Sequence, residues 1–221
     1  MESYCVQQAF TELQSSPCPV QDSGKTLIVF DWDDTLLPST FLTYGCGLRV
    51  SDDVPVPEDV GGRIDPVAEA AVEALSIAMQ HGDVVIVTNA EHGWVEMSSD
   101  KFLPRINHFI RENGITVVSA RSAFEEEIPD SPVDWKIGTF SQQVQSSDRK
   151  SYDNLVVIGD DECERLAGHA MSRIAPCLSI KTVKFVRKPE PSQLARQLGL
   201  LAQSLSDLCE EQGNHDVNFI V

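Results

Sequence analysis

The sequence predicts an α/β domain with a mostly parallel sheet of about five strands and helices on both faces. Short apolar runs alternate with longer segments of helical pattern along most of the 221 residues. Apolar runs that no polar residue interrupts are typical of parallel strands, which are buried on both faces. Strands separated by helices favour a parallel sheet with right-handed crossovers. Together these patterns predict a three-layer, Rossmann-like sandwich.

The expected strands are short runs in which valine, isoleucine and leucine dominate. They occupy residues 27–30, 83–88, 115–119, 154–159 and 182–186. The first, second and fourth are nearly continuous apolar runs that end abruptly in polar residues, which is typical of buried strands. The fifth contains Lys184, and lysines on a strand are typical of a sheet edge, where they prevent pairing with other sheets.

The expected helices lie between and after these strands. They occupy residues 66–75, 91–99, 104–113, 133–145, 161–173 and 191–210. The first is rich in alanine, and Asp65 followed by Pro66 is a typical helix start. The last helix carries leucines at alternating spacings of four and three residues. These leucines are Leu194, Leu198, Leu201, Leu205 and Leu208. This narrow stripe predicts packing against the helix's own domain or, alternatively, a coiled coil in a homo-oligomer.

The length and a hydrophobic content of 42% favour one globular domain with a full core. We expect this domain to cover residues 25–211, with a short flap at 38–64. Residues 1–24 are rich in Gln, Ser and Pro and are expected to be flexible. Residues 212–221 form a tail whose apolar end, 217–221, is expected either to dock on the domain or to bind another chain.

Composition excludes several classes of protein. The net charge of −17, from 34 acidic and 17 basic residues, argues against nucleic acid as a partner. No apolar run approaches the roughly 18 residues of a membrane span, and no secretory signal pattern is present. The six cysteines occur singly, as expected of reduced thiols in a cytoplasmic protein. One basic segment contains Lys181, Lys184, Arg187 and Lys188. These residues either prevent pairing of an edge strand with another sheet or form a patch that binds substrate.

The first strand is followed at once by the carboxylates Asp31, Asp33 and Asp34. The carboxyl ends of parallel strands form the usual ligand crevice of an open α/β sheet. Two carboxylates about 4 Å apart repel by roughly 4 kcal/mol at an effective dielectric constant near 20. This arrangement therefore favours a metal-assisted active site, although an acidic turn that caps a helix is the structural alternative.

Two other strands also end in polar residues. Thr88 and Asn89 follow the second strand, where a plain turn is the alternative interpretation. Asp160 and Asp161 follow the fourth strand, and Glu164 lies three residues further on. Carboxylate oxygens are the ligands that Mg²⁺ prefers, whereas acids that complement a helix dipole are the structural alternative.

The strand and the sequence Asp31-Trp32-Asp33-Asp34-Thr35-Leu36 resemble the first motif, D-x-D-x-T-L, of the haloacid dehalogenase-like (HAD) phosphatase superfamily. The resemblance implies that Asp31 is the nucleophile and a Mg²⁺ ligand. It implies that Asp33 is the general acid/base and binds the metal through its backbone carbonyl. Thr35 would brace the turn. An Asp at position 33 favours phosphate ester chemistry over the other reactions of the superfamily.

The same resemblance extends, in the family's order, to about Glu164. It implies that Thr88 binds a phosphate oxygen, with Asn89 as a second donor. Lys136 would steady both Asp31 and the phosphate, and Lys150 is the alternative to it. Asp160 would bind Mg²⁺ directly, and Asp161 or Glu164 would act through water. The family commonly has Asp where this chain has Glu164, so the choice between these two acids stays open.

The resemblance thus implies a Mg²⁺-dependent phosphatase that acts through an aspartyl-phosphate on Asp31. The flap is too short for a folded cap, and an uncapped site suits a phosphorylated macromolecule such as a phosphoprotein. A small phosphorylated metabolite, with an oligomer partner as lid, is the alternative substrate. A catalytically idle module that binds a phosphorylated partner or serves as a scaffold is the alternative function.

Overall fold

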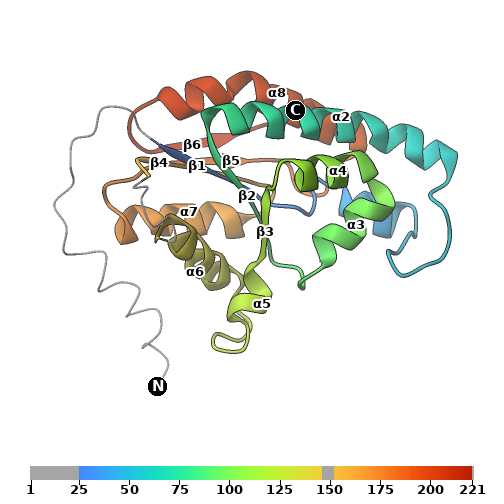
Figure 1. The fold of residues 1–221 in the computed structure, drawn as a ribbon, viewed down its shortest axis with the longest axis horizontal. Coiled ribbons are helices and arrows are strands. Elements are labelled where there is room, and N and C mark those ends of the chain that lie inside the picture. The colour runs from blue at the N-terminus through green and yellow to red at the C-terminus, as the bar shows by residue number, and fades with distance from the viewer. Residues whose placement is uncertain (1–24, 146–151, 221) are drawn as a thin grey trace.

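The computed structural model describes residues 25–145 and 152–220 (Figure 1). Its centre is one six-stranded sheet in the order β3-β2-β1-β4-β5-β6, in which every neighbouring pair is parallel. The strands are β1 (Thr26–Phe30), β2 (Gly82–Thr88), β3 (Thr116–Ser119), β4 (Asn154–Gly159), β5 (Ser179–Lys184) and β6 (His215–Asn218). The α/β class and the parallel sheet predicted from the sequence are confirmed.

Helices cover both faces of this sheet. The helical elements are η2 (Phe41–Gly45, a π-helix), α2 (Glu58–His81), α3 (Trp94–Phe102), α4 (Pro104–Glu112), α5 (Ala120–Phe124), α6 (Pro132–Gln145), α7 (Glu162–Ile174) and α8 (Pro191–Glu210). Figure 1 shows α2 and α8 on one side of the strands and α6 and α7 on the other. The result is the three-layer sandwich that the alternating pattern predicts.

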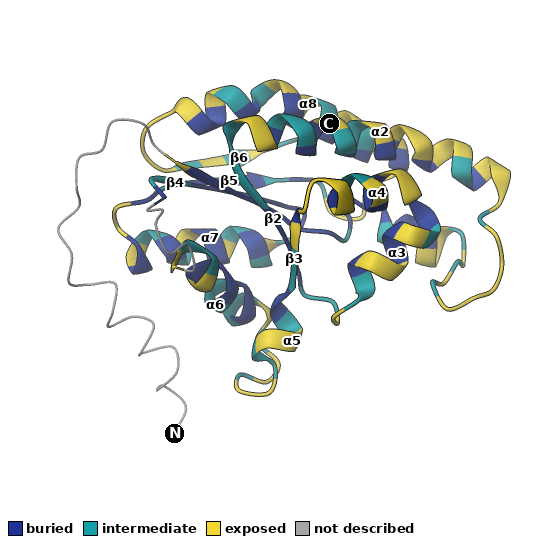
Figure 2. Ribbon diagram, in the orientation of Figure 1, coloured by how far each residue is buried: buried dark blue, intermediate teal, exposed yellow. Residues whose placement is uncertain are grey.

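Alternate residues of β1 serve two separate cores. Ile28 and Phe30 belong to the core beneath α2 and α8, whereas Leu27 and Val29 belong to the core beneath α6 and α7. This division follows from the two-residue period of a strand, whose successive side chains point to opposite faces. Figure 2 shows the resulting buried layer between the exposed outer surfaces of the helices.

The sheet has one strand more than the sequence predicts, because part of the C-terminal tail pairs with β5. The backbone N–H of Phe219 donates to the carbonyl of Lys184 at 2.9 Å. The Phe219 ring stacks on Phe185 with 5.7 Å between ring centroids. Of the two expectations for the tail, docking on the domain is therefore the one that the structure bears out. The basic strand β5 lies inside the sheet rather than at its edge.

Helix α2 begins eight residues before the predicted start at Pro66. Pro66 lies inside the helix, although proline costs a helix one backbone hydrogen bond. The first turns bury Val60 and Ile64 on the same face as Val67, and this apolar burial holds the helix together through the proline. As a consequence, the flap is confined to η2 and the loop that precedes Glu58.

The leucine stripe of α8 is buried within the chain. Leu194, Leu198, Leu201 and Leu205 are fully buried, and the helix packs along α2. Packing inside the domain is confirmed, so this stripe is not an exposed surface for a coiled coil. Within the described residues, no helix has both the length and the apolar character needed to cross a membrane.

The sheet order decides where the polar strand ends meet. Strand β1 lies between β2 and β4, so Asp31, Thr88 and Asp160 follow three neighbouring strands at the same edge. Since all three strands run in one direction, their carboxyl ends open onto a common crevice.

We expect Leu201→Ala to lower the free energy of unfolding by about 2–5 kcal/mol, because it opens a cavity between α8 and α2. Leu200→Ala, one residue earlier and partly exposed, is the matched control and should cost less than about 1 kcal/mol. Urea unfolding followed by circular dichroism measures both variants. Equal effects, or a change of oligomeric state in Leu201→Ala, would contradict the burial of this stripe within one chain.

Candidate functional site

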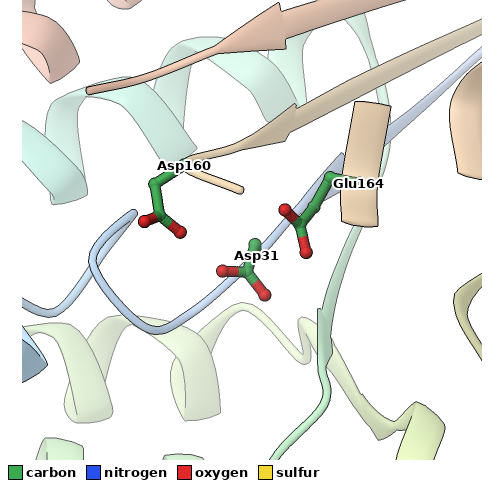
Figure 3. Close-up of side chains that lie close together, drawn as sticks. All are labelled: Asp31, Asp160 and Glu164. Atoms are coloured by element: carbon green, nitrogen blue, oxygen red, sulfur yellow. The ribbon is translucent and has the colours of Figure 1, made fainter. Parts of the chain in front are cut away.

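Three carboxylates from separate parts of the chain converge at the carboxyl end of the sheet (Figure 3). Asp31 follows β1, Asp160 follows β4, and Glu164 lies in the first turn of α7. One carboxylate oxygen of each lies within 4.8 Å of the others. The three residues are 7%, 8% and 5% exposed, respectively. Buried acids this close together are stabilised by a cation or by a bound proton.

Lys136 supplies one positive charge to this cluster. Its Nζ donates to Asp31 Oδ1 at 2.6 Å and to the carbonyl of Val87 at 3.2 Å, and it forms an ion pair with Glu164. Burial by itself lowers the pKa of this lysine, but the two carboxylates outweigh burial and raise the pKa above its usual value. Lys136 is therefore a fixed ammonium. Lys150, the alternative to it, lies outside the described residues.

The carboxylates remain in excess over this single ammonium. Burial raises the pKa of Asp31 to about 7, against the opposing effect of Lys136. Burial and the nearby charges of Asp31 and Glu164 raise the pKa of Asp160 to about 8. Among the described residues, no donor binds the Asp160 carboxylate. The nearby Lys184 donates instead to the backbone carbonyl of Asp160, at 3.0 Å. The cluster thus has an unmet demand for positive charge.

A divalent cation fits this demand. Oxygen ligands of Mg²⁺ lie at about 2.0–2.1 Å from the ion, so opposite ligands are about 4 Å apart. The three carboxylate oxygens lie within 4.8 Å of one another, which is of the same order as this largest ligand–ligand distance. The donors are hard oxygens, which suit Mg²⁺ or Ca²⁺ and disfavour soft metals.

The structure separates the two acids between which the sequence left a choice. Glu164 lies in the cluster, and its second oxygen accepts the backbone N–H of Asp161 at 3.2 Å. Asp161 instead caps α7 and pairs with Arg187 at 2.9 Å on the surface. Gly159 makes room for Glu164, because a Cβ at position 159 would lie 2.3 Å from its Cγ. Glu164 is therefore the better candidate for the second metal-site acid.

Asp33 lies beside the cluster and binds a different partner. Its two carboxylate oxygens accept the indole N–H of Trp94 at 3.0 and 3.1 Å. Burial raises the pKa of Asp33, and the Trp94 hydrogen bond partly opposes this rise. Trp94, in the first turn of α3, was not singled out from the sequence, where nothing distinguishes it from an aromatic residue of the core.

The turn after Asp33 is held by its own side chains. Asp34 adopts a left-handed conformation with φ of 54°, and its carboxylate accepts the backbone N–H of Thr40 at 2.9 Å. The Thr35 hydroxyl donates to Asp31 Oδ2 at 3.3 Å. Thr35, which was expected to brace the turn, thus contacts the Asp31 carboxylate.

Thr88 and Asn89 line the same cleft as Asp31 and Asp33. The buried Thr88 hydroxyl accepts the backbone N–H of Ala90 at 3.0 Å, and its own proton remains available to donate. The amide of Asn89 donates to the carbonyl of Pro132 at 3.4 Å, and its buried Oδ1 has no partner among the described residues. Both side chains are placed to contact a bound ligand.

The cleft itself is open and has a volume of about 410 Å³. The loop after β5 contributes Arg187 and Lys188 to its wall. The other two lysines of the basic segment do not form a surface patch. Lys181 is fully buried and donates to Asn154 at 2.5 Å, and Lys184 donates to the carbonyl of Asp160.

Three kinds of comparison with known proteins add no assignment to this geometry. No family model matches the chain, and no curated protein or solved structure matches it either.

Proposed function

We propose that this protein is a Mg²⁺-dependent phosphatase that hydrolyses a phosphate monoester through an aspartyl-phosphate on Asp31. The observation that carries the proposal is the buried cluster of Asp31, Asp160 and Glu164, with the Lys136 ammonium on the nucleophile candidate. The order of the motifs along the chain, which resembles that of the HAD superfamily, supports the same assignment. The Asp160 carboxylate, which has no donor within residues 25–145 and 152–220, supports the metal requirement.

In the first step, an Asp31 oxygen forms a bond to phosphorus while the bond from phosphorus to the leaving oxygen breaks. Asp33, protonated at this stage, gives its proton to the leaving oxygen. In the second step, water attacks the phosphorus of the aspartyl-phosphate and gives its proton to Asp33. This step releases inorganic phosphate and restores the Asp31 carboxylate. Covalent catalysis thus divides one difficult displacement into two easier ones.

The remaining residues stabilise charge and position the phosphoryl group. Lys136 offsets the charge of Asp31 as the phosphate approaches, and Thr88 and Asn89 donate to its oxygens. Mg²⁺, held by Asp31, Asp160 and Glu164, would neutralise negative charge on the acids and on the phosphate. Each group lies at the end of a sheet strand or on a helix packed against the sheet, so the site is rigid before substrate binds.

The open cleft supports a phosphorylated macromolecule, such as a phosphoprotein, as the substrate. Within the described residues, the flap consists of η2 and a loop, which is too little to enclose a small molecule. A bulky substrate excludes water from an open site by itself. We place the activity in the cytoplasm, because Cys46, Cys163 and Cys209 are free thiols.

Release of phosphate from p-nitrophenyl phosphate, with Mg²⁺ and with EDTA, tests the reaction. We expect turnover only with Mg²⁺, and we expect Asp31→Asn to lower kcat by more than about 10³-fold, because it removes the nucleophile. Asp161→Asn is the matched control, since Asn also caps helices well and Asp161 lies outside the cluster. Full activity of Asp31→Asn would eliminate the mechanism.

The idle-module alternative makes a different prediction for the same preparation. It requires Mg²⁺ binding, measured by calorimetry, without turnover of any phosphoester in a panel that includes phosphoserine, phosphothreonine and phosphotyrosine peptides. We expect turnover of at least one phosphopeptide, with a higher kcat/KM than for a small sugar phosphate. A preference for the small substrate would contradict the macromolecular assignment.

The charge excess also predicts a pH-dependent stability. The pKa of Asp160 is raised to about 8 in the folded protein, so the folded state holds its proton more tightly than the unfolded chain. Stability without metal must then fall as the pH rises from about 4 to 8. We expect Asp160→Asn to melt about 2–4 °C above the wild type at pH 8 in EDTA, and the difference to shrink at pH 6.

Mg²⁺ should raise the melting temperature of the wild type at pH 8 and leave that of Asp160→Asn nearly unchanged. Asp161→Asn, the control outside the cluster, should respond to the ion as the wild type does. Differential scanning calorimetry measures all three proteins. An equal response of Asp160→Asn and the wild type would refute the assignment of Asp160 as a metal ligand.

A further inference from the structure

We propose that Trp94 is a positioning residue that binds both oxygens of the Asp33 carboxyl group and thereby fixes the orientation in which this group gives its proton to the leaving group. This inference rests on the proposed phosphatase function and assigns a role to a residue outside the recognised motifs. The indole Nε1 of Trp94 lies 3.0 Å from Asp33 Oδ1 and 3.1 Å from Oδ2. Asp33 also lines the cleft that Asp31 and Lys136 share.

The hydrogen-bonding chemistry of indole gives this contact a direction. Indole N–H is a donor only, so both Asp33 oxygens act as acceptors toward it, at 3.0 and 3.1 Å. When Asp33 carries a proton, the proton therefore points away from Trp94, whichever oxygen carries it. In the first step this proton passes to the leaving oxygen as the bond to phosphorus breaks. A side chain without an N–H at position 94 leaves the carboxyl group free to rotate.

Helix α3 fixes the indole in place. Gly93, with φ of 86°, turns the chain into the helix, and the backbone N–H of Trp94 donates to the carbonyl of Glu91 at 3.1 Å. Ser98, one turn later on the same face, donates to the Trp94 carbonyl at 2.6 Å. The Ser98 hydroxyl also accepts the indole N–H of Trp32 at 2.9 Å.

One face of α3 therefore binds two successive residues of the loop that follows the nucleophile. Trp32 is fully buried and hydrogen-bonded to Ser98, and Asp33 is hydrogen-bonded to Trp94. The helix is anchored at its far end too, because Phe102 and the following Leu103 are buried in the core. The hydrogen bonds from Trp32 to Ser98 and from Trp94 to Asp33 hold the loop against α3. The Asp33 carboxyl group can then move little except by rotation about its own side-chain bonds.

General acid catalysis matters most when the leaving group is a poor one. An alkoxide, as from phosphoserine, needs a proton as it departs, whereas p-nitrophenolate leaves readily without one. Loss of the Trp94 hydrogen bond should therefore lower activity selectively on alkyl phosphates. The constant to compare is kcat/KM, because it reports the first chemical step, in which the leaving group departs.

The test measures kcat/KM of the full chain with Mg²⁺ on a phosphoserine peptide and on p-nitrophenyl phosphate. We expect Trp94→Phe to lower the value about 10- to 100-fold on the peptide and less than about 3-fold on the aryl ester. Asp33→Asn should show the same selectivity with a larger loss. Trp135→Phe is the matched control, because it removes an indole N–H that donates to the carbonyl of Ile128 at 2.6 Å, away from Asp33. It should affect both substrates equally.

Trp94→His keeps a ring N–H, and we expect it to retain more of the activity on the peptide than Trp94→Phe does. It also serves as the test if the phenylalanine variant does not fold, as judged by its thermal unfolding. Equal losses on both substrates in either folded variant would overturn the role of Trp94 while leaving the phosphatase assignment in place. A wild type that hydrolyses neither substrate would overturn both.

Discussion

The buried charge cluster around Lys136 is the constraint on which the rest of the site depends. One ammonium contacts two carboxylates, and a third carboxylate, Asp160, lies beside them with no donor among the described residues. An arrangement with more buried acids than bases is costly in an empty site, because burial disfavours each uncompensated charge. In the proposed enzyme a divalent cation would offset this excess and allow an anionic phosphate to approach. Burial, together with the charges of the neighbouring acids, raises the pKa values of Asp31 and Asp160.

The repulsion among the buried acids does not separate them, because the strands that carry them are packed on both faces of the sheet. Strands β1 and β4 are neighbours whose side chains fill two separate cores, so the backbone that carries Asp31 and Asp160 cannot move apart to relieve repulsion. Glu164 is held in turn by the capping interactions of α7, and Lys136 by the packing of α6. Rigid elements thus hold like charges together, and a binding site built on them is preorganised for a cation.

Two parts of the molecule complement this rigid centre. The cleft beside Asp31 is open, and α3 reaches across to the loop that follows Asp31. In the proposed mechanism these features have separate tasks: the sheet edge would hold metal and phosphate, and α3 would orient the general acid. The proposed chemistry needs both, because displacement at phosphorus requires charge neutralisation and proton delivery at different oxygens.

The sequence by itself determined the α/β class, the positions of four strands, and the acids and the lysine that the structure brings together, because apolar periodicity and polar strand ends are local signals. The fifth strand was predicted at 182–186 and lies three residues earlier at its start, at Ser179–Lys184. Tertiary structure decided the rest. The polar segment His215–Asn218 becomes a strand only because β5 offers it an edge, and α2 continues through Pro66 only because its first turns are buried. Glu164 rather than Asp161 enters the cluster because Gly159 leaves room for it. Trp94 contacts Asp33 across 61 positions of the chain. This contact depends on tertiary packing, so the local sequence around either residue does not predict it.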